Sequence, residues 1–104
     1  MKIKYYYQQV DKERKDQIEE YFSERKIKRI TSLLHAKDLE LALLDVRVKY
    51  FTHHNDFTVE LTLIIRRKKF FSEKRAFHLT EAFDIALDNL VVQLYKLENK
   101  RHKK

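Results

Sequence analysis

The stretch HLTEAFDIALDNLVVQLYKLENK, residues 78–100, decides the fold that the sequence predicts. Its apolar side chains recur in steps of three and four for about five turns, the period of a helix with one apolar stripe. The stripe consists of Leu79, Ala82, Phe83, Ala86, Leu87, Leu90, Leu94 and Leu97. His78 or Thr80 can cap the N-terminus, where Glu81 and Asp84 suit the helix dipole. So wide a stripe needs a flat apolar partner about 10 Å away, most simply a sheet.

Four upstream segments alternate apolar with polar residues and predict the strands of that sheet. We expect strands at residues 2–10, 39–51, 57–65 and 70–75. Residues 52–56 form a hairpin loop between the second and third strands, and Arg66 to Lys69 form a tight turn before the fourth.

A charged helical segment separates the first two strands. Asp11 is its expected N-cap, and the helix should extend from Lys12 to about Ala36, followed by a short turn at Lys37 and Asp38. The apolar positions slip by about one residue part-way along, which predicts a bulge or break between Ser23 and Ile27.

The resulting order is β-α-β-β-β-α, an α+β two-layer sandwich in which a four-stranded mixed sheet carries both helices on one face. The strands on either side of the first helix should be parallel with a right-handed crossover, and the other neighbouring pairs antiparallel. We expect one domain, residues 1–104, with a basic tail at 98–104.

Composition excludes several classes of protein. The chain has no cysteine, so it forms no disulfide, thiolate metal site or cysteine nucleophile. It has no glycine either, which excludes the loops that cradle phosphates in nucleotide-binding enzymes. No apolar run approaches the ~18 residues of a membrane span, and the N-terminus begins a strand pattern rather than a signal peptide. We therefore expect a soluble, cytoplasmic protein that does not act on membranes.

No group of residues forms a recognisable catalytic constellation. Three serines lack a strained-turn context, and three acids on the last helix are explained by the helix dipole. Adjacent side chains at a strand end point apart, so the His53–His54 pair does not predict a metal site. The three serines are Ser23, Ser32 and Ser72, and the three acids are Glu81, Asp84 and Asp88. The prediction is a protein that is not an enzyme and has no metal, cofactor or small-molecule substrate.

The formal net charge of +7 and the pI of about 9.6 point to an anionic partner, nucleic acid before membrane. The cations gather in three blocks, and we expect all of them to contact RNA phosphates. The blocks are Arg25, Lys26, Lys28 and Arg29; then Arg66, Arg67, Lys68 and Lys69; then Lys96, Lys100 and Arg101. The alternative for the first block is an ordinary solvated helix face. Tyr5, Tyr6 and Tyr7 could stack on bases, although two of them should pack in the sheet.

With this element order in place, the sequence resembles the family of ribosome hibernation-promoting factors and ribosome-associated translation inhibitors. The matching stretches are residues 46–51 and 57–63, then 78–90 and 93–96. Within the last helix the family pattern a-x-A-I-D-x-x-x-D-K-L-x-R-Q-L-x-K is met by Ala82, Asp84, Asp88, Leu90, Gln93, Leu94 and Lys96. The resemblance covers residues 44–97, and the first 40 residues follow it by element order.

The resemblance implies a function. Members of the family bind the small ribosomal subunit and its rRNA in the channel for mRNA and tRNA, block initiation and store idle ribosomes. It also implies that basic side chains on the two helices contact rRNA phosphates. The chain looks like the short members, which lack a second, dimerisation domain.

This sequence departs from the family pattern in its last helix. It carries Asn89, Val92 and Tyr95 where relatives have basic residues. Two alternatives therefore stay open beside ribosome binding: a basic domain with a different RNA target, and a protein-interaction module or weak homodimer formed through Val91, Val92 and Tyr95.

Overall fold

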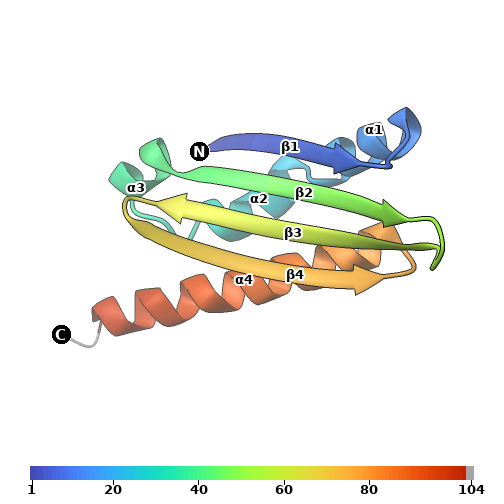
Figure 1. The fold of residues 1–104 in the computed structure, drawn as a ribbon. Helices are drawn as coiled ribbons and strands as arrows, with labels where there is room; N and C mark the ends of the chain where they lie inside the picture. Colours follow the sequence, from blue (N-terminus) through green and yellow to red (C-terminus); the bar gives the residue numbers. More distant parts are fainter. Residues whose placement is uncertain (103–104) are drawn as a thin grey trace.

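The computed structural model describes the backbone of residues 1–102 and the side chains of residues 1–97. Within this part the chain forms four strands and four helices (Figure 1). In chain order they are β1 (Lys2–Gln8), α1 (Lys12–Tyr21), α2 (Glu24–Thr31), α3 (Ala36–Leu41), β2 (Leu43–Phe51), β3 (Asp56–Ile65), β4 (Lys68–Ala76) and α4 (Leu79–His102).

The sheet has the order β1-β2-β3-β4, so each strand lies beside its neighbour in sequence. β1 and β2 are parallel, with Tyr5 opposite Val46. The two remaining pairs are antiparallel, with Val46 opposite Leu61 and Leu61 opposite Ser72. This confirms the predicted mixed sheet.

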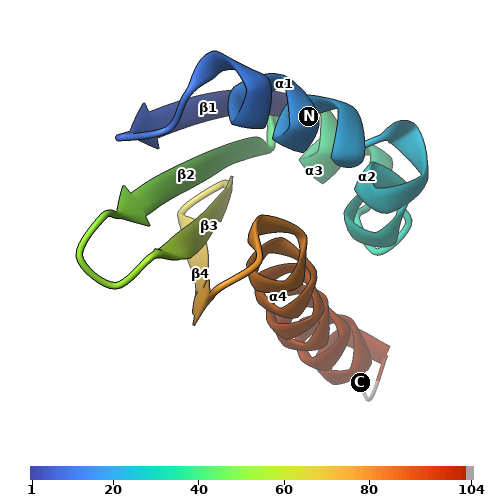
Figure 2. The same ribbon diagram turned by 90° about the vertical axis from the view of Figure 1, so that its right-hand side faces the viewer.

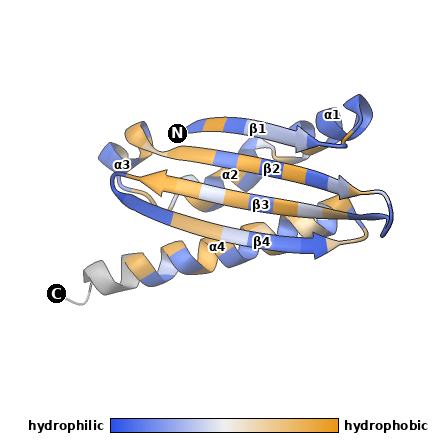
Figure 3. Cartoon of the chain, viewed as in Figure 1, coloured by the Kyte–Doolittle hydropathy of each residue, from blue (hydrophilic) through white to orange (hydrophobic). Residues whose placement is uncertain are grey.

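All four helices cover the same face of the sheet, and the other face is left bare (Figure 2). Alternation along the strands explains which face is covered, because every second side chain points toward the helices. The inward row includes Leu44, Val46 and Val48 from β2 and Val59, Leu61 and Leu63 from β3, all of them fully buried. Figure 3 shows the hydrophobic centres of β2 and β3, beside a hydrophilic C-terminal half of β4.

The α4 stripe packs on β3 and β4, as its period predicted. Phe83, Leu87 and Leu90 are fully buried, and Leu94 is 2% exposed. The Ser72 hydroxyl donates a hydrogen bond of 2.7 Å to the carbonyl of Ala86, which fixes α4 against the edge strand. The Ala82 amide donates to the His78 carbonyl, which makes His78 the residue that precedes the first helical turn. No helix among the described residues is both long and apolar enough to span a membrane.

The region between β1 and β2 differs from the prediction. Asp11 is the N-cap of α1, as expected, and its carboxylate accepts from the Arg14 amide at 2.8 Å. The helix stops at Tyr21 and α2 begins at Glu24, so the predicted break falls at Phe22 and Ser23. It turns the segment so that both Phe22 and Ile30 enter the core.

The prediction of a turn at Lys37 and Asp38, with a strand beginning at Leu39, was wrong. These residues belong to α3, and β2 begins only at Leu43. Ala36–Leu41 contains Ala, Lys, Leu and Glu, all of which favour helix, and the buried carboxylate of Asp38 pairs with Arg66 of the β3–β4 turn, which holds the helix at the edge of that turn. Lys68 and Lys69 were likewise misplaced in the turn, because they already belong to β4.

Candidate nucleic-acid interface

The first basic block lies on α2, and two of its four cations are paired with carboxylates of α4. The Lys26 ammonium is 2.9 Å from Oδ1 of Asp84, and Nη1 of Arg29 is 2.7 Å from Oδ1 of Asp88. Lys26 also lies 4.2 Å from the ring centroid of Tyr21. The Asp84–Asp88 spacing of one helical turn places both acids along α2. Half of this block is therefore neutralised within the fold.

Asp84 is the centre of this contact between helices. Its Oδ2 accepts a hydrogen bond of 2.6 Å from the Tyr21 hydroxyl, while Lys26 donates to Oδ1. Burial by itself would raise the pKa of Asp84, but the hydrogen bonds from Tyr21 and Lys26 outweigh it and hold that pKa below its usual range. The same hydrogen bond to Asp84 raises the pKa of Lys26. The pair is therefore ionised at neutral pH.

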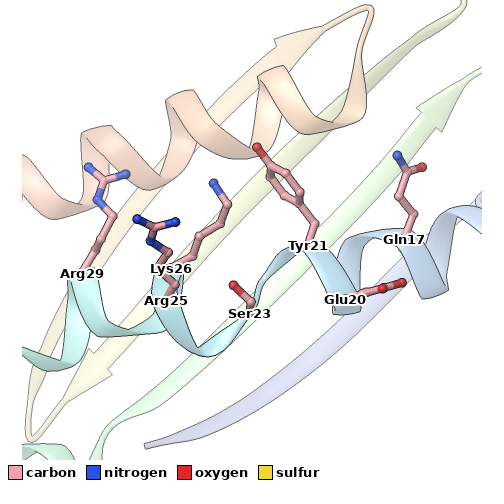
Figure 4. Close-up of a pocket in the computed structure, with 7 residues that line it drawn as sticks. All are labelled: Gln17, Glu20, Tyr21, Ser23, Arg25, Lys26 and Arg29. Atoms are coloured by element: carbon pink, nitrogen blue, oxygen red, sulfur yellow. The ribbon is translucent and has the colours of Figure 1, made fainter.

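A groove of about 790 Å³ lies along α1 and α2 on the side that faces α4. Figure 4 shows Tyr21, Lys26 and Arg29 reaching from the two helices toward α4. Arg25 lines the same groove and has no carboxylate partner among the described side chains. Lys28 lines a different hollow, beside Met1 and Ile3 of the β1 side. The first block is thus divided between two sides of α2.

The second basic block lies at the turn between β3 and β4. Arg66 has a left-handed backbone, with φ of 57°, and its Nε is 2.7 Å from Oδ1 of Asp38, whose side chain is 2% exposed. This ion pair ties the turn to α3. Arg67, Lys68 and Lys69 are exposed and have no carboxylate partner among the described side chains.

The second block and the C-terminal half of α4 lie at the same end of the molecule (Figure 1). A hollow of about 350 Å³ is lined by Arg66, Arg67 and Lys68 from the turn and by Leu97 from α4, over an apolar floor that includes Ile65. Lys96, next to Leu97 in α4, is exposed. The side chains of Lys100 and Arg101 lie outside the described residues. We call Arg66, Arg67, Lys68, Lys69 and Lys96 the basic end.

The apolar face proposed on α4 is smaller than the sequence suggested. Val92 and Tyr95 are 52% and 57% exposed, whereas Val91 packs against the core. A stable interface buries roughly 800 Å² on each partner, far more than two side chains supply. Among the described residues, no three His, Cys, Asp or Glu side chains are grouped in a way that would hold a metal ion.

The comparisons with known proteins agree with this fold. The model of the family described as Sigma 54 modulation protein / S30EA ribosomal protein matches residues 3–102. The chain belongs to this family. Membership confirms the resemblance to the ribosome hibernation factors and extends it over the first 40 residues, where only element order had supported it.

Two solved structures share the fold of this S30EA family member. One is the N-terminal domain of Protein Y from Thermus thermophilus, with a TM-score of 0.68 and 16% identity over 93% of this chain and 99% of that one. The other is a ribosomal subunit interface protein from Coxiella burnetii, with a TM-score of 0.65 and 12% identity over 95% of this chain and 99% of that one. At these identities the likeness is one of fold. No curated protein sequence matches the chain.

Sequence reasoning missed the acids that neutralise α2. It assigned Asp84 and Asp88 to the helix dipole, although their spacing of four residues suits the spacing of three between Lys26 and Arg29 when two helices lie side by side. It also missed the Asp38–Arg66 pair, because nothing local in the sequence links α3 to the β3–β4 turn.

Proposed function

We propose that this protein binds the small ribosomal subunit through its rRNA, occupies the channel of mRNA and tRNA, and keeps ribosomes idle. The observation that carries the proposal is the basic end, a group of exposed cations on a rigid domain of the S30EA family. Phosphate recognition needs dense positive charge that is not already paired inside the protein. The basic end meets this need better than α2 does.

The cations have unequal roles in this proposal. Arg67, Lys68, Lys69 and Lys96 contact phosphates directly, and Arg66 holds the turn in place through Asp38. Arg25 and Lys28 add contacts from α2. Lys26 and Arg29 contribute less, because the carboxylates of Asp84 and Asp88 already offset their charge. Lys100 and Arg101, whose side chains lie outside the described residues, add further phosphate contacts in this proposal.

Such a protein acts as a plug and needs no reacting group. The domain measures 50 × 24 × 21 Å, an elongated shape that can fill a channel. Its side chains bury a continuous core, so binding requires no folding of the domain and orders only the basic side chains. A function on ribosomes would place the protein in the cytoplasm.

The test is competition on the small subunit. Purified subunits would be incubated with the protein, and binding measured by sedimentation with and without mRNA and initiator tRNA. We expect the two ligands to displace the protein, and the protein to inhibit translation in a reconstituted system. Simultaneous binding of protein, mRNA and tRNA would contradict occupation of the channel.

A charge-matched pair of variants tests the surface. Arg67→Glu with Lys68→Glu should weaken subunit binding by at least tenfold. Lys12→Glu with Lys74→Glu changes the net charge equally at exposed positions outside the three blocks and should change binding far less. Equal losses in both variants would mean that only net charge matters. Equal affinity for plain duplex RNA and for subunits would favour a different RNA target.

A further inference from the structure

The bare outer face of the sheet carries a second surface suited to RNA, and it lies away from the basic end. We propose that the outer face, where β1 and β2 reach their C-terminal ends, binds unpaired RNA nucleotides by stacking. We call this surface the stacking face and define it by Gln8, Tyr6, Arg47, Lys49 and Phe51. It goes beyond the proposed function, which needs phosphate contacts only.

Strand alternation in β1 separates the three tyrosines. Tyr5 and Tyr7 point toward the helices and are half-buried, while Tyr6 points outward and is 40% exposed. The register places Arg47 of β2 directly beside Tyr6, and its guanidinium carbon lies 4.4 Å from the ring centroid. Proteins stack unpaired bases on aromatic rings and on arginine guanidinium planes, and this site offers one of each side by side.

A second aromatic–arginine pair stands on the same face. Phe51, at the end of β2, is 38% exposed, and the guanidinium carbon of Arg75 lies 4.6 Å from its ring centroid. Arg75 is held in place by Asp56, with 2.6 Å between Nε and Oδ2. Because Asp56 already neutralises Arg75, the Phe51–Arg75 pair offers a base a planar surface for stacking and adds little net positive charge.

Two adjoining hollows connect the pairs. One, of about 250 Å³, includes Tyr6 and Arg47 in its lining; the other, of about 360 Å³, includes Phe51 and the loop histidines His53 and His54. They share Gln8 and Lys49, so they adjoin each other at the strand ends. No carboxylate lines either hollow, although Glu60 approaches Lys49 at 3.7 Å from the neighbouring strand.

This combination fits unpaired nucleotides better than a duplex. Stacking needs the flat face of a base, which a duplex keeps inside its own stack, and every base has such a face. Lys49 and Arg47 can balance a phosphate, while the amides of Gln8 and Gln9 can donate to and accept from base edges. The flat exposed sheet leaves room for an extended strand (Figure 2).

The experiment measures binding of a fluorescent oligouridylate by anisotropy, beside a duplex RNA of equal length. We expect the single strand to bind more tightly at moderate salt. Tyr6→Leu should weaken its binding by about tenfold, since one stacked base contributes on that order. Arg47→Lys, which keeps the charge and removes the planar group, should weaken it by a smaller factor.

The matched control is Phe71→Leu, which removes an aromatic ring, 49% exposed, from the same face outside both hollows. It should leave binding unchanged, and thermal unfolding should show that the three variants remain folded. Equal losses for Phe71→Leu and Tyr6→Leu, tighter binding of the duplex, or no binding of the single strand would each overturn the proposal. A failure here would leave subunit binding by the basic end intact, whereas Arg67→Glu with Lys68→Glu tests that end alone.

Discussion

Among residues 1–102, three adopt left-handed backbone conformations although the chain has no glycine. Gln9, Asn55 and Arg66 have φ of 59°, 52° and 57°. Asparagine tolerates this region, but for other residues it costs about 1–2 kcal/mol. Turns with a left-handed backbone therefore form without glycine in this chain, and the fold imposes them at an energetic cost.

Gln9 offers a direct measurement of that cost. Replacing Gln9 by Gly should raise the free energy of unfolding by about 0.5–1 kcal/mol, since relief of strain exceeds the added entropy of the unfolded chain. Gln8→Gly, in the adjoining strand, should lower it. Urea denaturation of both variants is the test, and a destabilised Gln9→Gly variant would contradict the assigned strain.

Asp84 gives a prediction for pH. Its pKa is held below the usual 3.8, so its ionised form stabilises the fold above that value and the contribution disappears as pH falls through the lower folded pKa. Asp84→Asn should cost about 1 kcal/mol at neutral pH, a discounted figure because the side chain is 40% exposed. Denaturation of both proteins should show this difference shrinking as the pH falls below 3.8 and through the lower folded pKa. A difference independent of pH would contradict the argument.

At the scale of elements, the long segments with a regular apolar period were predicted correctly, whereas the short helices between β1 and β2 were not. The four strands and α4 follow from alternation and from the helical stripe, because one face of each is buried. The short helix α3 was missed although its residues favour helix, because Leu39 to Leu41 were assigned to the strand that follows, and its contact with Arg66 comes from a distant turn. The division of α1 from α2 was predicted only from the slip in the spacing of apolar residues, which indicated a bulge or break between Ser23 and Ile27.

The α4 stripe can be tested one residue at a time. Leu90→Ala should lower the free energy of unfolding by about 2–5 kcal/mol, because Leu90 is fully buried and the change leaves a cavity. Val92→Ala, two residues away and 52% exposed, should change it by about 0.5 kcal/mol or less. Similar losses in the two variants would mean that α4 buries a different face.

At the scale of the whole molecule, the positive charge is concentrated by the fold rather than by the sequence. The sequence presented three similar basic blocks, and it could not show that α4 neutralises part of the first or that the second lies beside α4 near Leu97. Both facts depend on α4 crossing the sheet beside α2 and the β3–β4 turn. The candidate interface therefore emerged from packing, whereas the net charge of +7 was visible at once.

The most direct test of the central claim is the salt dependence of binding to small ribosomal subunits. If about six phosphates are contacted, the logarithm of the association constant should fall with the logarithm of salt concentration with a slope of about −4 to −5. In Arg67→Glu with Lys68→Glu the slope should become shallower by about 2. Binding that is absent at low salt, or whose slope is the same in the variant, would contradict recognition of rRNA through the basic end.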